Sequence, residues 1–235
     1  MAKKEKKEAK ERIFEAAIFL FARKGYAAVG TREIAKEADV NVSMINYYYE
    51  GKLGILKEII NECYDKYFRA IRDADNKDAP PEGRVRLIAR GVVDFFKGNT
   101  ELAMAGFSVF PIDEPEIVDL KVKWATDNRK VTAGLFEQLG VDMDDTVQSN
   151  VVRGLLTGII QSHFRFKYAW KHMVEAAVRS GQTWERITEE PAEKLDDAFY
   201  EKYSDMLSEL YLHGLTSITS KKQPTKGGNS ETKNL

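Results

Sequence analysis

The chain has 235 residues, a formal net charge of −1 and a single cysteine, Cys63. One cysteine excludes an internal disulfide and a four-ligand zinc site, and the near-zero charge excludes a polycation that coats nucleic acid. No stretch approaches the ~18 apolar residues that are needed to cross a bilayer. We therefore expect no membrane anchoring and a cytoplasmic location.

The first residues place lysines ahead of the apolar run 13–22, which is the order found in signal peptides. Three glutamates alternate with the lysines, Glu15 interrupts the run, and no small-residue cleavage site follows, so we interpret this segment as the start of a helix. Residues 1–52 hold eleven Lys or Arg and eight Asp or Glu, a balance of +3 that leaves −4 for the remainder. A basic amino-terminal part on a slightly acidic body suits a protein that binds DNA at one end.

Residues 31–49 are predicted to form two short helices joined by a tight turn. The first covers 31–37 with Ala35 and Ala38 facing inward, and the second covers about 42–48. Such a short turn holds the helices at a steep angle and pushes the second outward, the geometry that places a recognition helix in the DNA major groove. Asp39 lies where the turn needs a positive φ, which Asp tolerates. Thr31 and Asn41 are placed to cap the two helices.

The second helix offers one outward patch. Val42 and Asn46 are four residues apart, as are Ser43 and Tyr47, so all four share a face. Asn can bind adenine through two hydrogen bonds, Val can contact a thymine methyl, and Ser or Tyr can bond to phosphate or a base edge. The residues that we predict to contact DNA are Thr31, Arg32, Asn41, Val42, Ser43, Asn46, Tyr47, Tyr48 and Lys52.

At these residues the chain resembles the TetR/AcrR family of bacterial one-component regulators. The likeness begins at Arg12 with RIFEAAIFLFARKGY and continues through Thr31, Ile34, Ala35, Ala38, Val40, Ile45, the run Tyr47-Tyr48-Tyr49, Lys52 and Leu56. It covers about the first quarter of the chain. The sequence departs from the family at five positions. Asp39 stands where the family usually has Gly, Asn41 where it has Ser or Thr, and Asn46 where it has Tyr. Tyr49 stands where the family usually has Phe, and Leu53 where it has an acidic residue. The departure at Asn46 leaves the operator sequence open.

Helical periodicity continues beyond Gly51. The predicted helices are 52–73, 84–97, 101–110, 117–139, 144–170 and about 192–215, and the segment 171–191 reads as an insertion in which Trp184 covers a pocket or braces a dimer. The predicted fold class is all-α: a three-helix helix-turn-helix domain at 1–51, a larger helical effector-binding and dimerisation domain at 52–216, and a disordered polar tail at 217–235.

Two helices carry apolar stripes that suggest dimerisation. Gly154 and Gly158 share one face, and each costs roughly 1 kcal/mol relative to alanine in a helix interior, so a partner helix or a ligand is expected to approach closely there. The alternative is that both glycines are merely tolerated. The family resemblance implies that the last two long helices pair across the dimer. The predicted interface residues are Gly154, Leu155, Gly158, Ser162, Phe199, Tyr203, Met206 and Leu210.

The resemblance also implies an effector pocket between the 52–73 helix and the middle helices. The candidates are Phe107, Phe110, Trp124, His163 and Phe164, although aromatic side chains at helical spacing are often plain core. Their density favours an apolar or aromatic effector. Arg153, Arg165 and Lys167 are placed either to meet an anionic ligand or to face water.

These observations predict a transcriptional regulator, and the resemblance implies a repressor. As a homodimer it would bind a palindromic operator with two recognition helices ~34–36 Å apart, and a small molecule in the 52–216 domain would release it. The alternative is an architectural DNA-binding protein of the same fold whose body binds another protein. His163, His172 and His213 lie in no nucleophile, metal or phosphate motif, so we expect no enzyme activity, no cofactor and no metal.

Overall fold

The computed structural model describes residues 2–108, 111, 113–180 and 195–220, and within these residues it is built from helices with no strand, as the sequence predicted. The helices are α1 (Ala2–Lys24), α2 (Thr31–Glu37), α3 (Ser43–Tyr49), α4 (Lys52–Ala74), α5 (Pro81–Gly98), α6 (Thr100–Ser108), α7 (Pro115–Gln138), α8 (Thr146–Arg179) and α9 (Asp197–Ser220).

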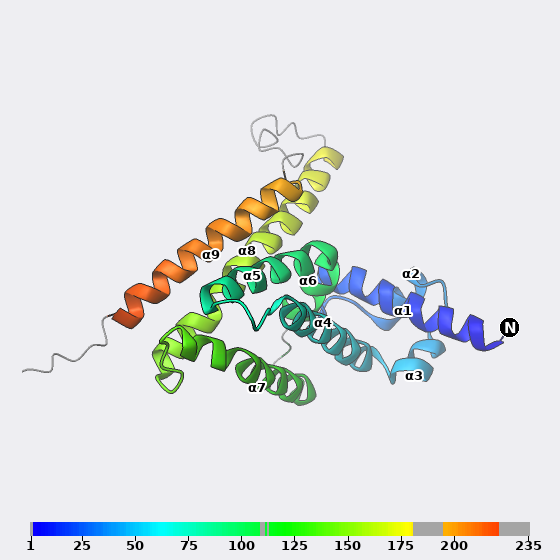
Figure 1. Cartoon of the computed structure of the whole chain (residues 1–235). Helices are drawn as coiled ribbons and strands as arrows, with labels where there is room; N and C mark the ends of the chain where they lie inside the picture. The colour runs from blue at the N-terminus through cyan, green and yellow to red at the C-terminus, as the bar shows by residue number, and fades with distance from the viewer. Residues whose placement is uncertain (1, 109–110, 112, 181–194, 221–235) are drawn as a thin grey trace, which may run out of the picture.

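The helices α1–α3 form a head at one end of the molecule, drawn in blue in Figure 1. Its centre is made by Ile13, Phe21, Ile34 and Ile45, none of which is more than 1% exposed. The next helix, α4, packs on α1 and α3 with its first turns and then runs into the body, α4–α9. The head and the body therefore share one continuous core.

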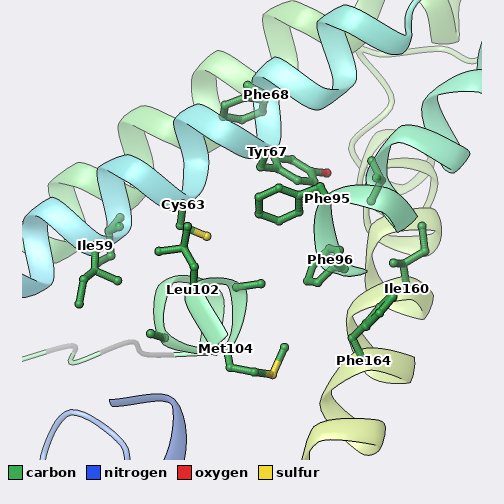
Figure 2. Close-up of a cluster of buried hydrophobic side chains, with 14 of the residues drawn as sticks. Ile59, Cys63, Tyr67, Phe68, Phe95, Phe96, Leu102, Met104, Ile160 and Phe164 are labelled. Carbon is green, nitrogen blue, oxygen red and sulfur yellow. The ribbon is translucent and has the colours of Figure 1, made fainter. Parts of the chain in front are cut away.

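The body core is shown in Figure 2, where side chains from α4, α5, α6 and α8 meet. Gly91 and Gly106 let the neighbouring helices approach α4 closely. A Cβ at Gly91 would lie 2.7 Å from the Cβ of Ala74, and one at Gly106 would lie 2.5 Å from the Cβ of Cys63. Because real Cβ atoms do not approach so closely, glycine is required at both places.

A second connection between head and body runs through α6, which packs on α1. The end of α6 is held by Lys121 of α7, whose buried Nζ donates to the carbonyl oxygens of Gly106 at 3.2 Å and Phe107 at 3.4 Å. Burial lowers the pKa of Lys121 to about 8. A movement of α7 would therefore be transmitted to the head through α6 as well as through α4.

The last two helices lie side by side at the edge of the body farthest from α3 (Figure 1). The hydroxyl of Tyr211 in α9 donates to the carbonyl oxygen of Val152 in α8 at 2.8 Å, inside the buried seam between the two helices. On its other side α9 packs on α5, where Arg86 forms an ion pair with Glu209.

Some predicted boundaries were wrong. The helix α8 continues to Arg179, so residues 171–179 belong to it and not to an insertion; Ala177 is buried and continues its inward face. The helix α9 extends to Ser220, so the first residues of the predicted tail are helical. Trp184, most of the predicted insertion and residues 221–235 lie outside the described residues.

Candidate DNA-binding surface and body cavity

The turn between α2 and α3 holds α3 outward. Asp39 has a φ of 50°, in the left-handed region, as its place in the sequence predicted. The N–H of Val40 donates to the carbonyl oxygen of Ala35 at 3.0 Å and closes the end of α2. Ala35 and Ala38 are each only 4% exposed, so small side chains lie where the two helices cross. The geometry is that of a helix-turn-helix unit.

The two predicted caps have different outcomes. The side-chain oxygen of Asn41 accepts hydrogen bonds from the backbone N–H of Ser43 at 2.9 Å and from its hydroxyl at 2.8 Å, so Asn41 does satisfy the first turn of α3. The prediction for Thr31 was wrong. The residue ahead of α2 is Gly30, in extended conformation with no side-chain hydrogen bond, and its carbonyl oxygen accepts from Glu33 and Ile34.

The outward side of α3 presents the predicted patch. Tyr47 is 67% exposed and Val42 is 42% exposed, and Ser43 and Asn46 beside them are exposed as well. Arg32 on α2 is exposed, whereas Thr31 is half-buried. Asn41 keeps its amide nitrogen, whose two N–H groups can donate to a phosphate. Val42, Ser43, Asn46 and Tyr47 are therefore all exposed on α3, where the sequence placed the outward patch.

Two predicted DNA contacts are directed inward. Nζ of Lys52 donates to the carbonyl oxygens of Tyr26 and Val29, each at 3.0 Å, and lies 4.1 Å from the centre of the Tyr26 ring. Lys52 therefore binds the loop between α1 and α2, whereas the sequence predicted that its side chain contacts DNA. Tyr48 is half-buried, and its hydroxyl is buried, whereas Tyr47, whose ring meets it edge to face at 4.9 Å, remains at the surface.

Four of the predicted effector residues belong to one continuous network of aromatic contacts, since Phe96 stacks on both Phe107 and Phe164. Trp124 stacks on Tyr64 and Phe68 of α4 with ring centres 5.6 and 5.5 Å apart, and Phe107 meets Tyr64 edge to face. Phe164 stacks between rings of α5 and α9, and His163 beside it lies 4.8 Å from the ring of Tyr203. Phe110 lies outside the described residues.

A cavity of about 40 Å³ lies elsewhere in the described part of the body, between α4, α5, α7 and α8. Its apolar wall consists of Ile71, Ile88, Val92, Phe136, Val152 and Leu156, and its polar lining consists of Tyr67, Thr132, Arg153 and Thr157. None of Phe107, Trp124, His163 and Phe164 lines it. Arg153 is the one cavity residue that the sequence analysis named as a possible ligand contact. The available signal was a cation next to Val152, which lies on the buried face of α8.

The end of α4 is fixed one helical turn from this cavity. Arg84 donates from Nε to Asp75 at 2.7 Å and from Nη1 to Gln138 at 2.9 Å, and so joins the end of α4 to α5 and α7. The side chains of Arg84 and Asp75 are each 7% exposed. Hydrogen bonds from Arg84 hold the pKa of Asp75 below its usual value. Because this network spans three of the four helices around the cavity, a change in the cavity would be transmitted to the end of α4.

The outer face of the α8–α9 pair exposes large apolar side chains. They are Val147, Val151, Leu155 and Phe166 on α8 and Met206 and Leu210 on α9. Gly154 and Gly158 lie at the edge of this stripe, with no other atoms within 4 Å of where a Cβ would be. Of the other predicted interface residues, Ser162 is exposed, and Phe199 and Tyr203 are half-buried.

Neither a metal site nor a membrane-spanning helix is found in the described ranges. No group of three or more His, Cys, Asp or Glu side chains is arranged there to hold a metal ion. No helix of that part of the chain is long and apolar enough to cross a membrane.

Residues 13–59 match the family model described as bacterial regulatory proteins, tetR family. The chain is 43% identical over 65 residues to the probable HTH-type transcriptional regulator YttP of Bacillus subtilis (strain 168). The matched residues make up 28% of this chain and 31% of that protein. The chain spans about a third of the length of the curated relatives it matches.

Solved structures resemble almost the whole chain. A TetR-like transcriptional regulator from Rhodococcus sp. RHA1 covers 88% of this chain and 96% of its own, with a TM-score of 0.59 and 16% identity. The fatty acid degradation regulator FadR from Bacillus halodurans gives the same coverage and identity with a TM-score of 0.61. At these identities the likeness shows the fold alone.

Proposed function

Because the chain belongs to the TetR family of bacterial regulatory proteins, we propose that it is a repressor that binds a palindromic operator as a homodimer and leaves it when a small molecule binds the body. In this proposal residues 1–51 bind DNA and residues 52–216 bind the effector and form the dimer. The observation that carries it is the exposed patch of Val42, Ser43, Asn46 and Tyr47 on the outward helix of a helix-turn-helix unit.

The patch has the chemistry of direct readout. The amide of Asn46 can accept from N6 and donate to N7 of adenine, while the methyl groups of Val42 can contact a thymine methyl. Ser43 and Tyr47 flank them and can bond to phosphate or a base edge. Thr31 and Arg32 at the start of α2 face the phosphates on the other side of the groove. Lys52 acts indirectly, by fixing the loop ahead of α2.

The exposed stripe on α8 and α9 supports the proposed dimer. Met206 and Leu210 are each 65% exposed, and Leu155 is 41% exposed, which is costly for a face left in water. A second copy related by a two-fold axis would cover it with the same stripe, and the open sides of Gly154 and Gly158 give its helices room to approach. One short recognition helix makes few base contacts, whereas two separated by ~34–36 Å read both halves of a palindrome.

The position of the cavity supports the proposed switch. The cavity touches α4 through Tyr67 and Ile71, and the other end of α4 packs against α3. A ligand that prefers a body with α4 tilted would change the separation of the two recognition helices. It can shift the balance only by the difference between its affinities for the two states.

The test uses the full chain and DNA from upstream of its own gene. Sedimentation or light scattering should give a dimer. Fluorescence anisotropy should show binding to an inverted repeat with much higher affinity than to scrambled DNA at the same salt concentration. A strictly monomeric chain, or one that ignores every duplex from its own locus at low ionic strength, would contradict the proposal. If no small molecule that binds the body changed the affinity for the operator, the architectural alternative would be favoured.

A further inference from the structure

We propose that the body cavity takes an anionic amphiphile, a monocarboxylate with a flexible aliphatic tail, whose head group binds the guanidinium of Arg153. The inference rests on the proposed function for its regulatory consequence, because it names the class of the effector. The binding of the ligand itself does not depend on the proposed function, and it can be measured without DNA.

The charge of the cavity lining indicates the head group. Arg153 is the one cation among the ten lining residues, and none of the ten is Asp or Glu. Its Nε donates to the carbonyl oxygen of Ser149 at 2.9 Å and its Nη2 to the hydroxyl of Ser149 at 3.2 Å. A guanidinium carries five N–H donors in a planar fork, so these two bonds leave a pair that can meet a carboxylate. A charge beside an apolar wall gains most from a partner of opposite sign.

The neutral polar groups of the lining already have partners. The hydroxyls of Tyr67 and Thr157 lie 3.0 Å apart and form a hydrogen bond with each other. Burial raises the pKa of Tyr67 to about 12, so the phenol stays neutral and adds no charge. The charge left in the lining is therefore that of Arg153, which a carboxylate can neutralise and an uncharged polar ligand cannot.

The wall indicates the tail. Ile71, Ile88, Val92, Val152 and Leu156 are aliphatic, and they come from α4, α5 and α8. The sixth apolar residue of the wall is Phe136 of α7, so the wall offers mostly methyl groups, which suits a flexible hydrocarbon chain. Each buried methylene is worth about 0.8 kcal/mol, so affinity should rise about three- to fourfold per added CH₂.

The volume links binding to movement. A cavity of about 40 Å³ holds roughly two or three waters, and an engineered cavity that binds benzene is roughly 150 Å³. An aliphatic tail therefore fits only when the surrounding helices separate. The packing described is the closed state, and the ligand would select a state in which the contacts around Ile71 of α4 have opened.

Isothermal calorimetry on the full chain tests the proposal with hexanoate, octanoate, 1-octanol and octylamine, all below their micelle concentrations. We expect octanoate to bind at least about tenfold more tightly than 1-octanol, octylamine to bind weakest, and octanoate to exceed hexanoate by about tenfold. Equal affinity for octanoate and 1-octanol, tighter binding of octylamine, or no binding of any of the four would overturn it.

Variants locate the head group. Arg153→Gln should bring the octanoate to 1-octanol ratio close to one, and Arg153→Lys should keep part of it. Arg165→Gln removes an exposed arginine of the same helix and should leave the ratio unchanged. A ratio that survives in Arg153→Gln refutes the assignment. Thermal unfolding without ligand shows that the variants are folded, and if Arg153→Gln is not, the comparison of Arg153→Lys with Arg165→Gln decides.

Operator release is measured separately, by anisotropy on the operator with and without octanoate. Arg153-dependent binding that leaves operator affinity unchanged would support the ligand class and contradict the switch. Release by 1-octanol at the same concentration as octanoate would support the switch and contradict the ligand class.

Discussion

The head and the α8–α9 pair deal with apolar side chains in opposite ways. In the head, Ile13, Phe21, Ile34 and Ile45 are buried against one another, and the large apolar side chains left outside are Val42 and Tyr47 of the DNA-binding patch. The α8–α9 pair buries an inner face and leaves a stripe of Val, Leu, Phe and Met side chains in water on the outer face. The head buries its apolar face within a single copy, whereas the pair leaves an apolar stripe uncovered.

This difference fits the two roles that we propose for these regions, DNA binding and dimerisation. A surface that reads bases must be polar and free in the unbound protein, because its partner is polar and highly charged. A surface that forms a permanent dimer can be apolar, because it is never exposed for long. The predictions below test whether the two regions really differ in this way.

The largest effect should come from charging the stripe. Leu155→Glu combined with Leu210→Glu places two acids from each subunit in the proposed interface, so we expect a monomer in light scattering. Operator affinity should fall by ~10²–10⁴, because the second half-site is no longer bound by a linked copy. Val122→Glu, at an apolar residue on α7 that is 59% exposed, is the matched control and should stay dimeric. A double variant that remained a dimer would show that the stripe has another use.

Truncating a buried side chain of the head should lower the free energy of unfolding. Phe21→Ala removes a ring that is 1% exposed and meets Tyr26 edge to face at 5.4 Å, so the head should lose about 3–5 kcal/mol of unfolding free energy. The counterpart Met206→Ala on α9 should change the stability of the monomeric double variant by less than about 0.5 kcal/mol. Chemical denaturation measures both. Similar losses at the two sites would remove the contrast between the regions.

A smaller effect is expected at the surface of the head. Asn46→Ala should lower operator affinity by ~1–3 kcal/mol, because two hydrogen bonds to one base pair are lost, while binding to unrelated DNA stays nearly the same. Anisotropy with matched operator and scrambled duplexes separates the two. An equal loss on both would mean that Asn46 holds phosphate and that the patch does not read sequence through it.

The helix-turn-helix unit could be predicted because its determinants are local. Asp39 in the turn, Ala35 and Ala38 at the helix crossing and the spacing from Val42 to Tyr47 all lie within one short segment. The cap at Thr31 was wrong for an equally local reason. Gly30 adopts the extended conformation from which α2 starts, and its carbonyl oxygen accepts the first helical bonds.

The cavity could not be predicted because no local pattern defines it. Tyr67, Ile88, Thr132 and Arg153 come from four helices, and periodicity identifies only which face of each is buried. Whether the inward side chains leave a gap depends on the helix crossings, which Gly91 and Gly106 set by close approach to α4. The aromatic side chains chosen from the sequence pack too well against one another to leave that gap.

The smallest effect should be a pH dependence of stability that arises from His163 of α8. His163 on α8 faces Phe199, Tyr200 and Tyr203 of α9; burial, and then the nearby Lys167, lower its pKa below the ordinary value of 6.5. The unfolded chain therefore binds a proton more readily than the folded chain, so the contribution of this group to stability is present above pH 6.5. It is lost as the pH falls from 6.5 through the folded-state pKa.

His163→Gln should remove this slope in denaturation curves measured between pH 7.5 and 5, and His213→Gln, at an exposed position of α9, should retain it. The slope should also be smaller in the monomeric double variant. Pairing of α8 and α9 with a second copy would bury His163 further and disfavour its charged form more strongly. An identical slope in monomer and dimer would place His163 away from the interface and narrow the stripe to the side of Leu155 and Leu210.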